Sequence, residues 1–369
     1  MPPRHKAPDG ASSKTARAKR SAGGAPDKPP FAKTKSVTLA LQGGAAHGAF
    51  VWGVLDRLLE DERLEIEGVS GTSSGAINAV LLASGMIGGD RTVARDLLAR
   101  FWRHVSDACE ERRWTVGMLF RLARSRIMQI SRKDALFDLM SRILLPYDFD
   151  PQTMNPLRSS IGAMVDFERL RQSSTIRLFV NATNVATNAN RIFDNADVSL
   201  DAVCASCCLP YLFDAVEVDG ERYWDGGYMG NPTIYPLIYH CATSDVVMVL
   251  TTPLGRKERP ESSADILTRV SEVSFTSAFM REMRAINFVT ELIERGHVSE
   301  ASGLRRINMH AVAPQADDPE FDVAQRFNAE WGFFQGMRSK GRAAAQAWLD
   351  DAFPKLGESS SIDVGGLFS

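Results

Sequence analysis

The chain has 369 residues, of which 44% are apolar and 24% are charged, a composition typical of a soluble globular protein. This length is enough for one large domain, or for one domain with a smaller appendage. The formal net charge is −2, and the two uncharged stretches of membrane-spanning length, 36–55 and 68–89, are interrupted by glycine and polar residues, which argues against transmembrane helices.

The first predicted segment is a basic tail over residues 1–36. It carries nine Lys or Arg against two Asp, a net charge of +7, and is rich in Pro, Gly, Ala and Ser. Such a composition predicts disorder. Two roles are open: peripheral contact with an anionic membrane or a nucleic acid, or a solvated tail without a specific partner. We favour the second, and we predict no specific nucleic-acid partner.

The localisation expected from the sequence is cytoplasmic. No apolar stretch follows the basic residues at the start, so no secretory signal is predicted. The five cysteines are odd in number and show no disulfide framework, which suits a reducing compartment. Membrane association through the basic tail is the alternative that this expectation leaves open.

After the tail, the sequence predicts a strand over 37–41, a glycine-rich loop over 42–48 and a helix over 49–60. A dinucleotide-binding loop needs G-x-G-x-x-G, and Ala45 breaks that pattern. A P-loop ends in G-K-[ST], whereas Gly48 is followed by alanine and phenylalanine. The interpretation that remains is an oxyanion hole.

In that interpretation, the backbone N–H groups of Gly43 and Gly44 reach the carbonyl oxygen of a substrate, because small residues let it come close. The N–H group of Ser74 would join them, since it follows the candidate nucleophile described next.

A second strand, over 64–70, and a helix over 76–83 flank the sequence Gly71-Thr72-Ser73-Ser74-Gly75. This is a G-x-S-x-G motif on a strand-to-helix turn. There the serine takes a strained backbone conformation, and the two glycines prevent a clash between strand and helix. The turn would expose the Ser73 hydroxyl at a helix N-terminus, which favours developing negative charge. An ordinary Gly/Ser turn is the alternative.

The remaining elements extend an alternation of strands and helices, which predicts a three-layer α/β/α fold with a largely parallel central sheet. A mainly helical C-terminal extension follows it. The predicted elements are amphipathic helices within 90–145, a strand over 175–187, a hairpin over 216–224 that turns at Asp219-Gly220, a buried strand over 245–252, long helices over 266–295 and 322–350, and a strand over 306–312. Apolar residues between 101 and 145 are a candidate acyl-binding surface, although core packing is the preferred interpretation.

The cysteine-rich segment 204–208 raises the question of a metal site, with Cys241 as a fourth ligand. However, residues 201–209 resemble a short helix of small residues that Pro210 ends, in which cysteines act as packing groups. No second C-x-x-C motif or pair of histidines accompanies them, so we predict no metal.

A serine nucleophile needs a base. Asp225 stands out because it follows a predicted strand and precedes Gly226 and Gly227, on a tight turn that can approach another backbone closely. A plain Asp-Gly turn is the alternative. His240, His297 and His310 are formal candidates for the third member of a triad, because they follow Asp225 in the chain, but none stands in a context that favours catalysis.

Three motifs in this order and spacing give the chain a resemblance to the patatin-like phospholipase family. They are Gly43-Gly44-x-x-His47-Gly48, Gly71-x-Ser73-x-Gly75 and Asp225-Gly226-Gly227. The segment Ala205 to Phe213 and the pair Asn231-Pro232 also resemble that family, and the similarity covers residues 37–255. The resemblance implies that Ser73 is the nucleophile and that Asp225 is its partner in a Ser–Asp dyad without histidine. It implies an oxyanion hole at 43–45, and no cofactor.

The resemblance divides the chain into the tail (1–36), a catalytic domain (37–255), a mainly helical C-terminal region (256–356) and a loose end (357–369). Two residues depart from the family pattern. Ala45 replaces the third glycine of the loop, and a methyl group is expected there only at negative φ. His47 replaces a Lys or Arg, and we assign it to loop structure or to charge stabilisation.

The function that the resemblance implies is hydrolysis of lipid esters, of the phospholipase A or esterase type, through an acyl-enzyme intermediate. Two alternatives remain. One is an esterase or depolymerase that acts on short or polymeric esters. The other is a catalytically weakened lipid-binding protein, which Ala45 and His47 suggest and the intact Ser73 and Asp225 oppose.

Overall fold

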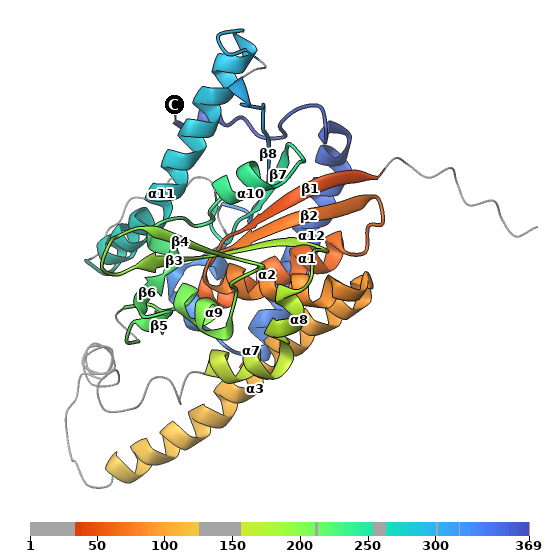
Figure 1. Ribbon diagram of the computed structural model, residues 1–369. Coiled ribbons are helices and arrows are strands. Elements are labelled where there is room, and N and C mark those ends of the chain that lie inside the picture. Colours follow the sequence, from red (N-terminus) through yellow and green to blue (C-terminus); the bar gives the residue numbers. More distant parts are fainter. Residues whose placement is uncertain are drawn as a thin grey trace, which may run out of the picture. The chain divides into compact units, whose positions relative to one another are not determined.

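A computed structural model of the chain describes residues 34–124, 156–210, 213–253, 263–299, 302–316 and 318–368 (Figure 1). The predicted tail up to residue 33 and the predicted helices over 125–145 lie outside the described residues. The described residues from Thr34 onward cluster into one compact unit. The boundary predicted at 255 therefore stays a prediction.

The centre of this unit is an eight-stranded sheet in the order β5-β6-β3-β2-β1-β7-β8, with β4 paired to β3. The strands are β1 (Lys35–Leu41), β2 (Leu64–Gly71), β3 (Arg177–Asn184), β4 (Asn190–Asp194), β5 (Val216–Val218), β6 (Glu221–Asp225), β7 (Asp245–Val249) and β8 (Asn308–Val312). Pairs among β3, β2, β1, β7 and β8 are parallel, whereas β4, β5 and β6 pair antiparallel. The predicted fold class, with a largely parallel sheet, is confirmed.

Helices cover both faces of the sheet (Figure 1). They are α1 (Gly48–Leu58), α2 (Ser74–Gly85), α3 (Arg91–Arg124), α7 (Pro156–Met164), α8 (Phe167–Arg171), α9 (Leu200–Ser206), α10 (Tyr235–His240), α11 (Ser263–Glu294) and α12 (Trp331–Ala352). None of the described helices combines the length and the apolarity that crossing a membrane requires.

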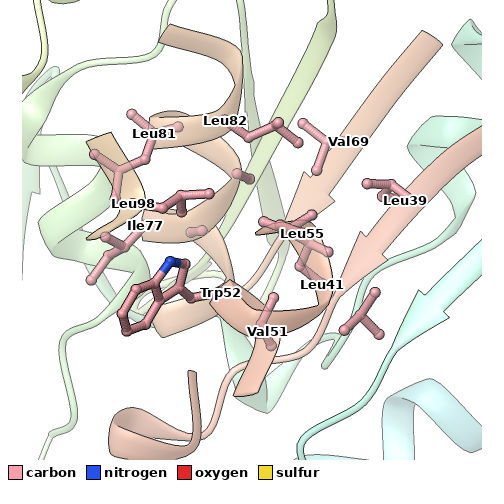
Figure 2. Close-up of a cluster of buried hydrophobic side chains, with 14 of the residues drawn as sticks. Leu39, Leu41, Val51, Trp52, Leu55, Val69, Ile77, Leu81, Leu82 and Leu98 are labelled. Atoms are coloured by element: carbon pink, nitrogen blue, oxygen red, sulfur yellow. The ribbon is translucent and has the colours of Figure 1, made fainter. Parts of the chain in front are cut away.

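The larger core lies on the face of the sheet that carries α1, α2 and α3. Leu39 and Leu41 of β1 and Val69 of β2 pack there against Trp52 and Leu55 of α1 (Figure 2). Successive side chains of a strand point to opposite faces, so Ala40 lies in the second core, with residues of α10 and α11. The sheet is thus buried on both faces, which explains why the residues of β7 after Asp245 are all apolar.

The C-terminal region packs closely on the α/β part of the fold. A Cβ atom on Gly53 of α1 would lie 2.1 Å from the Arg338 carbonyl oxygen, and one on Gly341 of α12 would lie 2.1 Å from that of Phe50, so the two helices cross in near-backbone contact. Asp56 of α1 accepts hydrogen bonds from Arg338 and Arg342 of α12.

Two predicted elements deserve comparison with the structure. The hairpin over 216–224 is confirmed, with Asp219 and Gly220 both at positive φ in its turn. The helix predicted over 322–350 is wrong at its start, because α12 begins at Trp331 and residues 323–327 form a separate 3₁₀ turn.

Candidate active site

The strand-to-helix turn has the strained geometry expected of a nucleophile elbow. Ser73 lies between β2 and α2 at φ 54° and ψ −125°, a region that non-glycine residues rarely occupy. A Cβ atom on Gly71 would lie 2.4 Å from the Gly75 carbonyl oxygen, and one on Gly75 would lie 2.2 Å from the Leu41 carbonyl oxygen. The predicted reason for both glycines is confirmed, since any side chain there would strike backbone.

The glycine loop lies directly against this turn. A Cβ atom on Gly43 would be 2.7 Å from the Cβ atom of Ser73, and one on Gly44 would be 2.5 Å from Thr251 Oγ1. A Cβ atom on Gly48 would lie 2.7 Å from Ser74 Oγ. Only glycine therefore lets the two loops approach.

Hydrogen bonds occupy two of the four amides expected to form the oxyanion hole. Gly43 N–H donates to Asn231 Oδ1 at 2.7 Å, and Gly44 N–H donates to Ser74 Oγ at 3.0 Å. Across the part of the chain that the structure describes, the N–H groups of Ala45 and Ser74 donate to no protein acceptor. These last two amides are the ones available to a substrate oxygen.

Ala45 adopts a backbone conformation that the sequence argument excluded. Its φ is +51°, so the expectation of a negative φ is wrong. The left-handed region is disfavoured for alanine by about 1–2 kcal/mol. Contacts around the loop, such as the 2.8 Å hydrogen bond from Thr251 Oγ1 to the Gly43 carbonyl, hold the chain in place despite that cost.

His47 points away from the cavity that contains Ser73. Its side chain is fully buried, its Nε2 lies 3.1 Å from the Glu320 carbonyl oxygen, and its ring is 5.3 Å from that of Phe321. His47 thus links the glycine loop to the C-terminal region. Of the two roles expected for it, this geometry favours loop structure.

Asp225 ends β6 with its carboxylate buried. Its Oδ1 accepts a 2.8 Å hydrogen bond from the Gly227 N–H, and its Oδ2 has no hydrogen-bond partner among the described residues. Burial raises the pKa of Asp225 to about 7, and the interactions with Gly227 and with the Ser73 hydroxyl offset only part of that effect. A carboxylate with a pKa near 7 can accept a proton at neutral pH.

Both glycines after Asp225 are required by close contacts. A Cβ atom on Gly226 would lie 2.3 Å from the Asn181 carbonyl oxygen, and one on Gly227 would lie 2.2 Å from the Phe275 ring. The Asp-Gly-Gly turn is therefore packed between β3 and α11.

Ser73 and Asp225 line one cavity of about 350 Å³, together with Gly43, Gly44 and Ala45. The apolar part of its wall comes from Leu209, Leu250, Phe275, Phe279, Met280 and Phe327. Of the candidate acyl-binding segment 101–145, Phe101 and Trp102 are core residues, and positions 125–145 lie outside the described residues. The apolar wall comes instead mostly from α11 and its surroundings.

The sequence did not assign a role in the site to Gln42, Ser206 or Asn231, although all three shape it. Asn231 holds Gly43 through its side chain, and its carbonyl oxygen accepts from Gln42 Nε2 at 3.2 Å. Ser206 Oγ accepts the Ser73 N–H at 3.0 Å. The Ser206 and Asn231 positions lie within segments that carried the family resemblance, which was the available signal.

No histidine lines the cavity with Ser73 in the part of the chain that the structure describes. His310 is fully buried in β8, where its Nε2 lies 3.0 Å from Asp245 Oδ1 and its Nδ1 lies 3.0 Å from Ser361 Oγ. Asp245 begins β7, at the end of the sheet opposite to the Ser73 turn. His240 and His297 are exposed.

The cysteines near α9 are ordinary buried thiols. Burial raises the pKa of Cys204 to about 11 and that of Cys208 to about 12, which disfavours the thiolates that metals bind. The described residues contain no group of side chains that could hold a metal ion.

Comparison with known proteins identifies the family. Residues 39–238 match the model of the patatin-like phospholipases, and the chain belongs to that family. This membership supports a lipid hydrolase. No curated protein matches the sequence significantly.

Several solved structures show a distant likeness to the chain. One is VipD from Legionella pneumophila, at 16% identity over 86% of this chain and 67% of that chain, with a TM-score of 0.35. Another is the type III effector protein ExoU, at 16% identity over 87% of this chain and 53% of that chain, with a TM-score of 0.33. In its complex with SpcU from Pseudomonas aeruginosa, ExoU matches at 15% identity over 88% of this chain and 55% of that chain, with a TM-score of 0.30. The chain thus spans about half the length of ExoU.

Proposed function

We propose that the protein hydrolyses carboxylic esters of lipids with Ser73 as nucleophile and Asp225 as general base. The observation that carries this proposal is the pairing of a strained, cavity-lining serine with a buried carboxylate whose Oδ2 has no hydrogen-bond partner among the described residues. Proton transfer requires a hydrogen bond between hydroxyl and base, and an Oδ2 that no other group occupies is available to accept one from Ser73 when substrate binds.

In the first step, Ser73 Oγ bonds to the ester carbonyl carbon while its proton moves to Asp225. The tetrahedral intermediate then expels the alcohol, which takes the proton from Asp225, and an acyl-enzyme remains. Water repeats the sequence on the acyl-enzyme: it gives a proton to Asp225 and attacks the carbonyl carbon. The bond to Ser73 Oγ then breaks, Ser73 takes the proton from Asp225, and the fatty acid is released. Asp225 ends each cycle ionised, as it began.

The oxyanion formed in each step would be held by the N–H groups of Ala45 and Ser74. Both lack a protein acceptor among the described residues, and Ser74 begins α2, whose N-terminal dipole favours negative charge. Gly43 and Gly44, which the sequence also assigned to the oxyanion hole, act in this proposal by letting the loops approach and by fixing the loop through their bonds to Asn231 and Ser74.

The apolar wall supports a fatty acyl group as the substrate moiety. Phe275, Phe279 and Met280 of α11 and Leu209 face the cavity that contains Ser73, so an acyl chain would lie against them. Short and polymeric esters would enter the same site. Rates of hydrolysis of esters with different acyl lengths distinguish these substrate classes.

The test is labelling by a fluorophosphonate, which reacts with activated serines, followed by turnover of esters of graded acyl length. We expect the label on Ser73, and we expect Ser73→Ala to abolish both labelling and hydrolysis while the protein stays folded. Ser339→Ala removes an exposed serine hydroxyl of α12 and serves as the matched control. Labelling confined to another serine would refute the assignment, and a folded wild type that hydrolyses no ester would favour a weakened lipid-binding protein.

A further inference from the structure

The N-terminal half of α11 carries exposed apolar side chains beside the mouth of the active-site cavity. Ile266, Val270 and Val273 are 52%, 59% and 51% exposed. Their spacing of four and three residues places them on one face of the helix. The same part of α11 contributes Phe275 and Phe279 to the cavity wall.

Phe327 is a second exposed apolar feature, at the cavity itself. It is 68% exposed and also lines the cavity with Ser73. An exposed apolar side chain therefore belongs to the lining of the cavity itself.

The exposed charges around this apolar face are cationic, and one of them, Arg269, pairs with the buried Glu272 at 3.1 Å. Between residues 266 and 288 of α11, the exposed charged side chains that the structure describes are Arg269, Arg281 and Arg284. The two glutamates of this stretch are turned inward. Glu272 is buried and faces the cavity, and Glu282 accepts a 3.0 Å hydrogen bond from the Ile234 N–H. An apolar stripe flanked by arginines complements an anionic lipid surface.

We propose that this face of α11, defined as Ile266, Val270 and Val273, docks on a bilayer that contains anionic phospholipid. The inference rests on the proposed function, because it gives the cavity direct access to lipid esters in the membrane. The apolar side chains enter the headgroup boundary, the arginines bind lipid phosphates, and the cavity mouth at Phe327 faces the acyl chains.

The first experiment measures flotation with vesicles of phosphatidylcholine, with and without phosphatidylserine. The full-length wild type is compared with Ile266→Ser/Val270→Ser/Val273→Ser, whose three positions lie outside the cavity lining. Val93→Ser is the matched control, because Val93 is an exposed valine on α3, at 47% exposure. High ionic strength screens the basic tail and leaves the apolar contribution.

We expect the triple variant to bind anionic vesicles at least about tenfold more weakly at high ionic strength, since it loses the burial of three aliphatic side chains. Val93→Ser should bind like the wild type, and wild-type binding should weaken when phosphatidylserine is omitted. Both variants should turn over a soluble short-chain ester at the wild-type rate. A protein that fails to hydrolyse this ester but still shows the binding difference would refute the proposed function and leave the docking face intact.

A second variant tests whether position 270 itself enters the bilayer. Tryptophan fluorescence of Val270→Trp, corrected for the wild type, should be quenched by vesicles that carry brominated acyl chains, whereas Val93→Trp should not respond. Equal vesicle binding by the triple variant and the wild type, or absence of quenching at position 270, would overturn the proposal. The proposal would also be overturned if the wild type sedimented as a dimer and the triple variant as a monomer, with equal vesicle binding by both. The face of α11 would then bind a second copy of the chain.

Discussion

The burial of Asp225 predicts a linked dependence of activity and stability on pH. Its ordinary pKa is 3.8, and burial raises it to about 7 in the folded protein. This difference of about three pH units corresponds to roughly 4 kcal/mol. Between these two values the folded protein holds a proton that the unfolded chain has released, so the contribution of Asp225 to stability is lost as the pH rises through this window.

Asp225→Asn isolates this effect, because the amide has the shape of the carboxyl group but does not titrate. The free energy of unfolding of the variant, minus that of the wild type, should increase by about 3 kcal/mol between about pH 5 and about pH 8. Urea denaturation at both pH values measures it. Asp219→Asn, at an exposed hairpin turn, is the control and should show no such trend.

Activity should respond to the same titration in the opposite sense. Only the ionised carboxylate accepts the Ser73 proton, so kcat/KM for a soluble ester should rise with pH and reach half its maximum near pH 7. Asp225→Asn should lower kcat by at least about 10³-fold. A wild-type profile that is flat through neutral pH, together with a stability difference that does not depend on pH, would refute the assignment of a buried, proton-accepting Asp225.

Three further predictions concern other parts of the chain. His240→Gln and His297→Gln should each keep kcat within about tenfold of the wild type, because both side chains are exposed; a loss as large as that of a missing base would replace the dyad with a triad. Ala45→Gly should raise the free energy of unfolding by about 1 kcal/mol in urea titrations, since glycine tolerates a φ of +51°, and a decrease would contradict the strain argument. Deleting residues 1–33 should leave the melting temperature and soluble-ester turnover unchanged. A longer deletion that also removes Lys35 should lower the melting temperature, because Lys35 Nζ donates hydrogen bonds to three carbonyl groups near the end of the chain. Equal effects of the two deletions would contradict a boundary of the folded unit after residue 33.

The local geometry of the site followed from short stretches of sequence. The G-x-S-x-G motif between a strand and a helix predicted the strained Ser73 and the need for glycine at positions 71 and 75. The conflict at Gly71 involves Gly75 of the same turn, whereas the conflict at Gly75 involves Leu41 at the end of the neighbouring strand β1. The alternation of strands and helices predicted the mostly parallel sheet, since consecutive elements of this kind pack in few ways.

The availability of the loop amides was decided by tertiary structure. Gly43 and Asn231 are 188 positions apart, and their hydrogen bond depends on how β1 and the turn after β6 meet. The sequence identified the backbone N–H groups at 43–45 and 74 as candidate donors. It did not predict which of them already donate to an acceptor within the protein. Likewise, the direction in which His47 points is set by Phe321 and Glu320 of the C-terminal region.

The sequence by itself determined which residues are candidates for the chemistry, because a strand-to-helix turn and an Asp-Gly-Gly turn are built by neighbouring residues. Only the tertiary structure decided the pKa of Asp225, since that depends on exclusion of water by packed segments from distant parts of the chain. It also decided that α11, a helix beyond the segment matched by the family, supplies much of the apolar wall. Side chains from elements far apart in the chain become neighbours only when the hydrophobic cores on both faces of the sheet have formed.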